Sequence, residues 1–284
     1  MQIWMNDKLV DESDAVVSVF DHGLLYGDGI FEGIRVYNGR IFEHQKHIER
    51  LYLSAQAIRL KIGIEIETMI DYVQQTVTAN NIENGYIRLI VTRGKGDLGL
   101  DPFVCEAPQI IIIAANVALY PKSFYETGLK IISANTMRAH PLTISPQIKS
   151  LNYLNNILAK MEAIDQGVLE AIMYNHMGYV SEATGDNVFI IRKGIIYTPP
   201  SDAGALEGIT REVIMTLARE AGYTVIEKNL TRYDLHIADE MFLTGTAAEV
   251  IGVIEIDGRV IGEGTPGNVT KNLLSIFNAY ARGN

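Results

Sequence analysis

Lys149 is the residue of this chain that is best placed for covalent chemistry. It lies in the stretch Pro146-Gln147-Ile148-Lys149-Ser150-Leu151, between a proline-marked loop and the start of an expected helix. A lysine amine condenses with an aldehyde to form a Schiff base. Other lysines share the chain, so the position rather than the residue type makes Lys149 a candidate. A bound aldehyde would need further residues to hold it.

Two segments have the composition of an anion-binding turn. Gly208-Ile209-Thr210-Arg211-Glu212 opens an expected helix, and the exposed amides at a helix N-terminus attract anions. Leu243-Thr244-Gly245-Thr246-Ala247-Ala248-Glu249 follows an expected strand, and its small residues and hydroxyls let the backbone approach an anion closely. An ordinary helix start and an ordinary strand-exit turn remain the alternatives.

Four charged or phenolic side chains could hold the rest of a ligand. Glu182 is flanked by apolar residues, which has two interpretations. The carboxylate could face inward and pair with a partner such as a protonated ring nitrogen. It could instead lie in a surface turn. Arg50 lies beside the apolar face of an expected helix, where its guanidinium could bind a phosphate or be solvated. Tyr86 and Arg88 alternate on an expected strand and therefore share one face, where they could hold a carboxylate.

Several other chemistries are not supported. Net charge is −10 at pH 7, which argues against non-specific nucleic-acid binding. The single cysteine, Cys105, excludes an intrachain disulfide and is interpreted as a packed thiol in a reducing compartment. His44 and His47 lack a third metal ligand nearby and are interpreted as surface residues, so no metal is expected.

No secretory signal is evident, and the longest apolar run, Ile110–Ala115, is far shorter than the ~20 residues that span a bilayer. We expect a cytoplasmic protein without a membrane partner.

The expected elements mix helices and strands without strict alternation, which indicates an α+β fold. An Asn38-Gly39 pair predicts a hairpin. Residues 151–166 predict a helix with Leu151, Leu154, Leu158 and Met161 on one face. The expected domains are a small N-terminal domain at residues 1–117, an interdomain loop at 118–127 and a large C-terminal domain at 128–284. Helices are expected at 43–61, 67–80, 151–166, 209–221 and 268–282, and strands at 86–92, 109–115, 129–134, 170–175, 187–191, 194–198, 223–230 and 240–244.

Taken in order, these segments resemble the fold type IV pyridoxal-phosphate enzymes over essentially the whole chain. The likeness is greatest to the branched-chain amino-acid aminotransferases. The motifs that carry it are Phe20-Asp21-His22-Gly23-Leu24-Leu25-Tyr26-Gly27-Asp28-Gly29-Ile30-Phe31-Glu32-Gly33-Ile34-Arg35, His47-Ile48-Glu49-Arg50-Leu51, Ile148-Lys149-Ser150-Leu151-Asn152-Tyr153, Glu182-Ala183-Thr184-Gly185-Asp186-Asn187, Gly208-Ile209-Thr210-Arg211-Glu212 and Gly245-Thr246-Ala247-Ala248-Glu249.

The resemblance implies a two-domain fold with pyridoxal 5'-phosphate between the domains. Lys149 would hold the cofactor and move the proton between the cofactor and the substrate's Cα. Tyr153 would hydrogen-bond the phenolic oxygen, Glu182 would pair with the pyridine nitrogen, and Leu206 would pack under the ring. The remaining cofactor-binding residues would be Arg50, Asn187, Gly208, Ile209, Thr210 and Thr246. The substrate pocket would be lined by Tyr26, Phe31, Tyr86, Arg88, Thr246 and Ala247.

The activity that this resemblance implies is transfer of the amino group of leucine, isoleucine or valine to 2-oxoglutarate. A D-amino-acid aminotransferase is the nearest alternative, but the loop Arg93–Pro102 lacks the Arg and His pair that those enzymes use. Aminodeoxychorismate lyase is a second alternative. A non-catalytic binding dimer on this scaffold would be expected to lose Lys149 or Glu182, and both are present. A homodimer or higher homo-oligomer is implied, with the loop at 97–104 reaching the partner's site.

Overall fold

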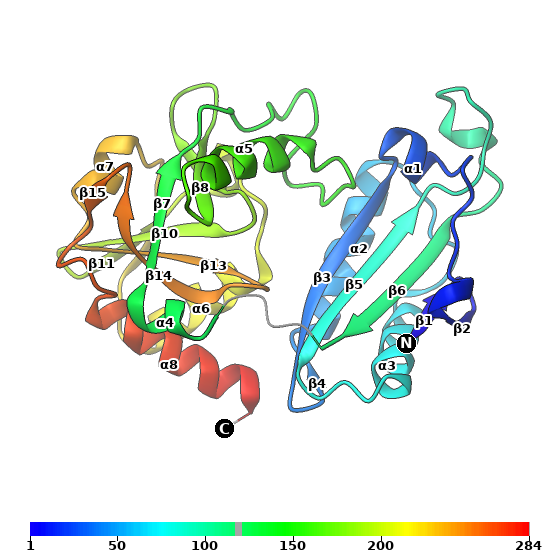
Figure 1. Cartoon of the computed structure of the whole chain (residues 1–284), viewed down its shortest axis with the longest axis horizontal. Coiled ribbons are helices and arrows are strands. Elements are labelled where there is room, and N and C mark those ends of the chain that lie inside the picture. The colour runs from blue at the N-terminus through cyan, green and yellow to red at the C-terminus, as the bar shows by residue number, and fades with distance from the viewer. Residues whose placement is uncertain (117–120, 284) are drawn as a thin grey trace. The chain divides into compact units, whose positions relative to one another are not determined.

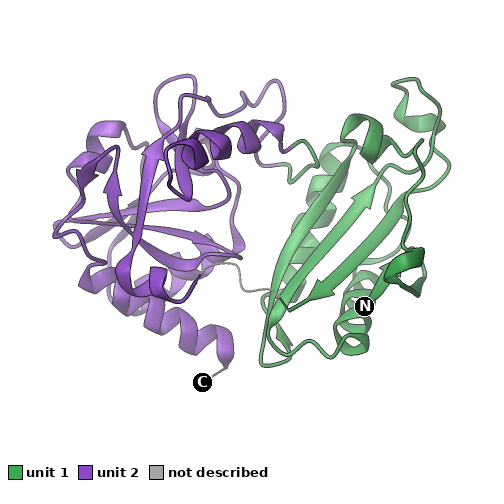
Figure 2. Ribbon diagram, viewed as in Figure 1, with its two compact units in different colours: residues 1–118, 148–152 green, residues 119–147, 153–284 purple. Residues whose placement is uncertain are grey.

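The chain folds into two compact units, drawn in different colours in Figure 2. This computed structural model describes residues 1–116 and 121–283. The first unit comprises residues 1–118 and 148–152, and the second comprises residues 119–147 and 153–284. The expected linker at 118–127 begins outside the described residues, and the domain limits 1–117 and 128–284 stay a prediction. The segment Ile148–Asn152 groups with the first unit, although the sequence alone placed it in the second domain.

Within the described part of the first unit, six strands form one antiparallel sheet in the order β2-β1-β6-β5-β3-β4 (Figure 1). They are β1 (Gln2–Met5), β2 (Lys8–Asp11), β3 (Gly29–Tyr37), β4 (Arg40–Ile41), β5 (Gly85–Thr92) and β6 (Gln109–Ala115). Asn38 and Gly39 join β3 to β4 with φ angles of 50° and 76°, as a two-residue type I′ turn requires. The expected hairpin is confirmed.

Two long helices cover one face of this sheet (Figure 1). The helices of the first unit are α1 (His22–Tyr26), α2 (His44–Ala57) and α3 (Ile66–Ala79). Ile48, Leu51 and Ala55 recur three or four residues apart on α2, and all three are buried in the core together with Ile87 and Leu89 of β5. This spacing forms one apolar stripe on a helix, and α2 confirms the helix expected at residues 43–61.

The second unit contains a mixed sheet in the order β12-β11-β10-β13-β14-β7-β8-β9, with β15 paired to β14. The pairs β11–β12, β14–β7 and β7–β8 are parallel, and the others are antiparallel. The strands are β7 (Leu129–Ser133), β8 (Glu170–Tyr174), β9 (Val180–Ala183), β10 (Asn187–Arg192), β11 (Ile195–Thr198), β12 (Val225–Glu227), β13 (Glu240–Gly245), β14 (Glu249–Ile256) and β15 (Arg259–Val260).

Helices pack on this sheet at two places. The helices are α4 (Ser123–Thr127), α5 (Leu154–Asp165), α6 (Ile209–Glu220), α7 (Arg232–His236) and α8 (Asn268–Arg282). α5 contacts β8, whereas α6 and α8 contact β13 and each other. Inside the sheet, Phe189 of β10 lies opposite Phe242 of β13, and their rings stack with centroids 4.8 Å apart. Helices and strands are mixed without strict alternation, which confirms the expected α+β class.

The apolar face expected on the 151–166 helix does not pack against the sheet. α5 begins at Leu154 instead of Leu151, and the side chains of Leu154, Leu158 and Met161 are 67%, 46% and 53% exposed. The residues that α5 buries are small, Ala159 and Ala163 among them, and they pack in a cluster with β8. Small side chains let the axis of α5 approach the sheet closely. The face with Leu154, Leu158 and Met161 therefore points away from the sheet.

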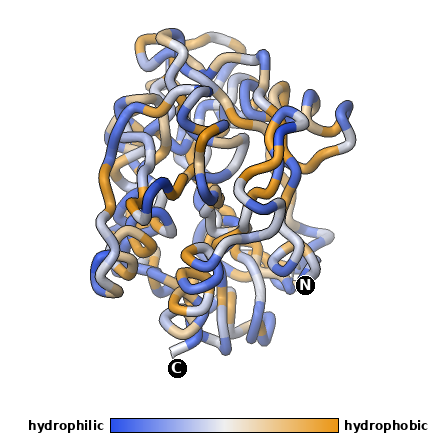
Figure 3. The backbone as a smooth tube through the Cα atoms, turned by 90° about the vertical axis from the view of Figure 1, so that its left-hand side faces the viewer, coloured by the Kyte–Doolittle hydropathy of each residue, from blue (hydrophilic) through white to orange (hydrophobic). Residues whose placement is uncertain are grey.

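Figure 3 colours the backbone by hydropathy and shows short hydrophobic stretches interspersed with hydrophilic ones along the chain. None of the helices within residues 1–116 and 121–283 is long and apolar enough to cross a membrane.

Candidate active site

Lys149 lies in an extended segment that is bonded to β3 and α2 in the first unit. Its carbonyl accepts a hydrogen bond from the Phe31 amide at 2.9 Å, and its own amide donates to Ser54 Oγ at 3.2 Å. The next residue, Ser150, forms an isolated β-bridge with Ile30. The sequence placed Lys149 at the entrance of a helix, whereas the structure holds it by these contacts with a strand and a neighbouring helix.

Phe31 is the centre of an aromatic and cationic cluster. Lys149 Nζ lies 4.7 Å from the centroid of the Phe31 ring, and Arg88 Cζ lies 4.6 Å from it. Arg88 Nη2 also donates to the Tyr86 hydroxyl at 3.2 Å. Gly33 makes room for this phenol, because a Cβ at that position would overlap the Tyr86 hydroxyl. The first unit thus brings together Lys149, Phe31, Tyr86 and Arg88.

Tyr26, the other substrate-pocket residue expected in the first unit, lies in α1. Its hydroxyl donates to the Leu98 carbonyl at 2.6 Å. This bond connects α1 to the loop at 97–104, and His22 Nε2 lies 2.9 Å from the Asp97 carbonyl of the same loop. Tyr26 therefore helps to place the loop that the resemblance assigns to the partner's site.

Arg50 is bound to a buried carboxylate that the sequence analysis did not single out. Its Nε and Nη2 donate to Glu32 Oε1 and Oε2 at 2.8 and 2.7 Å. His47 Nδ1 lies 2.8 Å from Glu32 Oε2, and His47 is fully buried. The expectation that His47 is a surface residue is therefore wrong. A signal was present, because Glu32 stands among apolar residues in Ile30-Phe31-Glu32-Gly33-Ile34, and an unpaired carboxylate is rarely buried.

Glu182 lies in β9 of the second unit and is buried. Its Oε2 accepts a hydrogen bond from the Leu206 amide at 2.9 Å and one from Asn187 Nδ2 at 3.3 Å, and its Oε1 accepts one from Arg138 Nη2. Of the two interpretations left open by the sequence, the inward-facing carboxylate is confirmed and the surface turn is wrong.

Arg138 is a second residue that the sequence analysis missed. The guanidinium is buried and, besides Glu182, donates to the Gly204 carbonyl at 3.1 Å and to Asn156 Oδ1 at 2.8 Å. Asn156 in turn donates to the Thr184 carbonyl at 2.8 Å. Arg138 and Glu182 are far apart in sequence, so no local pattern could have paired them.

The two expected anion-binding turns lie beside Asn187 and its neighbour Asp186. Asn187 pairs with Thr244 across β10 and β13. A Cβ at Gly208 would overlap Asn187 Oδ1, and a Cβ at Gly245 would overlap Asp186 Oδ1. The segments at 182–187, 208–210 and 244–246 therefore meet in the second unit.

Polar groups without partners mark these turns. Thr210 is 2% exposed, and its hydroxyl has no hydrogen-bond partner within the described residues; the same holds for the buried Thr244 hydroxyl. Gly208 caps α6, whose first amides have no acceptor within the helix. Thr246 and Ala247 form the turn between β13 and β14. An oxyanion is the ligand that such donors suit.

The first and second units each carry part of the expected site. Tyr26, Phe31, Arg50, Tyr86, Arg88 and Lys149 belong to the first unit, and the second contains Tyr153, Glu182, Asn187, Leu206, Gly208, Ile209, Thr210, Thr246 and Ala247.

Comparison with known proteins matches residues 29–256 of this sequence to the amino-transferase class IV family. The sequence is 50% identical to a Methanocaldococcus jannaschii protein over 277 residues, which are 98% of this chain and 95% of the relative. That relative's name provisionally assigns it to the branched-chain-amino-acid aminotransferases. The chain belongs to the class IV aminotransferases. The family expected from the motifs is thereby confirmed.

Solved structures of other class IV aminotransferases agree in fold. The branched-chain amino acid aminotransferase of Escherichia coli superposes with a TM-score of 0.96 at 36% identity, covering 99% of this chain and 95% of that one. The branched-chain amino acid aminotransferase of Thermobaculum terrenum, solved in its PLP-bound holo-form, superposes with a TM-score of 0.91 at 30% identity, covering 99% and 94%. The fold type IV expectation is confirmed.

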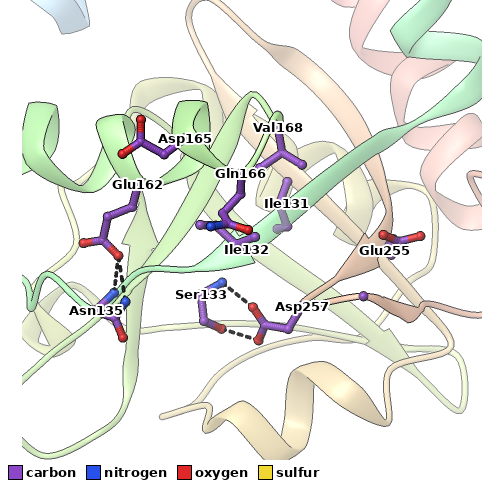
Figure 4. A pocket seen from close by; sticks show the side chains of 11 residues that line it. Ile131, Ile132, Ser133, Asn135, Glu162, Asp165, Gln166, Val168, Glu255 and Asp257 are labelled. Atoms are coloured by element: carbon purple, nitrogen blue, oxygen red, sulfur yellow. Dashed lines mark hydrogen bonds between the residues drawn. The ribbon is translucent and has the colours of Figure 1, made fainter.

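This class IV aminotransferase has a cavity of about 540 Å³ in the second unit, with several carboxylates in its wall (Figure 4). Asp257 accepts hydrogen bonds from the Ser133 amide and hydroxyl at 2.6 and 2.7 Å, and Glu162 accepts one from the Asn135 amide at 2.6 Å. Glu255 pairs with Lys130 at 2.9 Å. These carboxylates already have donors, and the residues described here contain no metal-binding group of three or more ligands.

Proposed function

We propose that this class IV aminotransferase moves the amino group of branched-chain L-amino acids to 2-oxoglutarate and uses pyridoxal 5'-phosphate. The observation that carries the proposal is the cluster around Phe31, where an amine and a guanidinium lie over one apolar ring and the guanidinium donates to a phenol. The names of the relatives in the comparison support the same substrate class.

The residues present fit the cofactor. A phosphate would satisfy the buried Thr210 hydroxyl and the first amides of α6, and the glycine at 208 permits a close approach. Glu182 would stabilise a protonated ring nitrogen, because an opposite charge favours the charged form. The bound cofactor would supply an aldehyde and an electron sink. Tyr153, Leu206, Thr246 and Arg50 are the further residues that would contact it.

Lys149 would hold the cofactor and carry the proton to and from the substrate's Cα. The contacts of its backbone with Phe31 and Ser54 fix where its side chain begins. Positioning of this kind matters because a displaced base loses rate steeply. The Thr246-Ala247 turn would receive the substrate's α-carboxylate.

The substrate pocket must accept an apolar side chain and the carboxylate arm of glutamate in turn. Phe31 offers an apolar surface, and Arg88 with Tyr86 offers donors for a carboxylate beside it. One cluster thus supports both half-reactions.

One observation disfavours the D-specific alternative. The loop that would trap an α-carboxylate begins at Arg93, but Arg93 donates to both oxygens of Asp28 at 2.8 and 3.0 Å and to the carbonyls of Ile58 and Arg59. Its guanidinium is therefore engaged in holding the loop.

A homodimer is the assembly we propose. Exposed apolar side chains cluster on α5 and in the loop at 97–104, where Leu98, Leu100 and Phe103 are 69%, 79% and 63% exposed. Exposed apolar surface is characteristic of an interface between subunits. Light scattering of purified protein tests it: Leu158→Glu should shift the molar mass from dimer toward monomer, and a wild type that is monomeric at micromolar concentration would contradict it.

We also propose a cytoplasmic location, since the one cysteine cannot form an intrachain disulfide.

The decisive experiment offers the protein L-leucine or D-alanine with 2-oxoglutarate, and in a third assay 4-amino-4-deoxychorismate. We expect turnover of leucine, a visible absorbance band from the bound cofactor, and loss of both in Lys149→Ala. Turnover of the D-substrate alone, or pyruvate release from the third substrate alone, would replace the proposal with one of the alternatives. A colourless protein that does not bind added cofactor would refute it.

A further inference from the structure

Glu32, His47 and Arg50 form a buried three-residue group in the first unit. Glu32 lies on β3 next to Phe31, and because side chains alternate along a strand the two point to opposite faces. The Glu32 carboxylate is fully buried beneath α2. His47 and Arg50 are three residues apart on α2 and therefore lie on the same side of the helix.

The charge state of this group follows from its contacts. Burial favours the neutral carboxyl, but the Arg50 charge and the His47 hydrogen bond outweigh it and hold the pKa of Glu32 well below its usual range. Burial lowers the pKa of His47. A neutral imidazole then donates from Nδ1 to the carboxylate and presents a lone pair at Nε2. Within the described residues that Nε2 has no partner.

Glu32 fixes one edge of the Arg50 guanidinium. Nε and Nη2 both bond to the carboxylate, in the bidentate geometry that sets the plane of the fork as well as its position. An arginine side chain loses rotamer entropy when it is ordered, so an arginine that is already ordered binds an anion without that loss. The His47 bond in turn restricts the carboxylate.

We propose that Glu32, braced by His47, is the positioning residue that orients Arg50 toward the cofactor's phosphate. The inference rests on the proposed function, in which Arg50 binds that phosphate. A buried ion pair is weak evidence for a stabilising role, whereas an orienting role accounts for the two-point contact and for the histidine on the same carboxylate.

The test is a double-variant cycle on apo-protein, with cofactor binding measured by equilibrium dialysis. Dissociation constants for pyridoxal 5'-phosphate and for pyridoxal, which lacks the phosphate, are compared in wild type, Glu32→Gln, Arg50→Ala and the double variant. We expect Glu32→Gln to weaken binding of the phosphorylated form by about tenfold and to leave pyridoxal nearly unchanged. In the Arg50→Ala background, adding Glu32→Gln should then weaken binding of pyridoxal 5'-phosphate almost no further.

Several outcomes would overturn the inference. Equal weakening of both ligands by Glu32→Gln would indicate a merely structural role, and so would an undiminished effect in the Arg50→Ala background. Unchanged binding in Glu32→Gln would also overturn it. Failure of the wild type to bind the cofactor refutes the proposed function instead, and wild-type affinity in Arg50→Ala refutes the phosphate role of Arg50.

Two further variants complete the design. Glu49→Gln removes the same charge from an exposed position beside Arg50 on α2 and should bind like the wild type. If circular dichroism shows that Glu32→Gln does not fold, His47→Gln tests instead whether the His47 hydrogen bond to Glu32 is needed to orient Arg50. It should lower the affinity for the phosphorylated form relative to pyridoxal, and an unchanged ratio would overturn the inference.

Discussion

Gly208 and Asn187 approach each other so closely that a methyl group at position 208 would overlap the Asn187 side-chain oxygen. Asn187 Nδ2 also donates to the Leu206 carbonyl at 3.0 Å and to Glu182. One asparagine thus joins the helix start of the expected phosphate site to the carboxylate expected at the ring nitrogen.

Gly208→Ala should therefore impair cofactor binding. The added Cβ displaces Asn187 from both of its acceptors and moves the start of α6, and such overpacking costs about 1–3 kcal/mol. We expect a dissociation constant for pyridoxal 5'-phosphate at least tenfold higher, measured by absorbance titration. Gly222→Ala offers no such crowding, since nothing lies within 4 Å of a Cβ there, but its positive φ of 86° adds strain. That variant should lose stability without losing affinity.

Removal of Arg138 should destabilise the second unit strongly. Arg138→Leu leaves the Glu182 carboxylate buried without its cation, and breaking such a pair costs about 3–5 kcal/mol. Urea denaturation measures the loss. Lys130→Leu provides the matched control: its partner is Glu255 at 2.9 Å, its side chain is 59% exposed, and an exposed pair is worth less than about 1 kcal/mol. Equal losses in the two variants would contradict this explanation.

Stability should fall as the pH drops from about 6.5 toward 4, in part through His44. Burial and the neighbouring His47 lower the pKa of His44 to about 4, and its Nε2 is buried with no partner in the described chain. Below about pH 6.5 His44 takes up a proton in the unfolded chain but not in the native state. The stability that neutral His44 contributes to the native state is therefore complete above pH 6.5 and is lost as the pH falls toward 4. After solvent screening we expect about 1–2 kcal/mol. His44→Asn should flatten the slope over that window, measured by urea denaturation at half-unit pH steps.

Arg88→Gln should separate the two half-reactions. Loss of a hydrogen bond to a charged group costs about 1.5–3 kcal/mol, which predicts a KM for glutamate and 2-oxoglutarate raised roughly tenfold or more. Leucine, which brings no side-chain carboxylate, should be affected much less. Stopped-flow measurement of each half-reaction checks this, and parallel losses for both substrates would count against the role given to Arg88.

Local sequence patterns predicted the helices and strands well, but they predicted poorly which residues pair across long stretches of sequence. The helix at 43–61 was predicted correctly because a helix that covers one face of a sheet repeats its apolar positions, here Ile48, Leu51 and Ala55, every three or four residues. The larger apolar residues of α5 follow the same spacing, but there the small residues pack inside and the larger ones are exposed. Periodicity reports an apolar face but does not say which partner covers it.

The candidate site shows the same division. Glu182 was predicted to need a partner, but Arg138 could not be identified because their pairing depends on tertiary structure. Glu32 was overlooked although its apolar neighbours made it unusual. Lys149 was found from its position and the motif around it, while its backbone contacts with Phe31 and Ser54 were beyond the reach of sequence.

The membership of residues 148–152 in the first unit has a consequence for how the chain folds during synthesis. The residues on both sides of that segment belong to the second unit. Because a ribosome delivers the chain from its N-terminus, the first unit cannot complete its packing until the beginning of the second has already emerged. A fragment that stops at residue 118 would lack the extended segment that bonds to β3 and would also lack Lys149. The first unit is thus completed late, and by the segment that carries the proposed catalytic lysine.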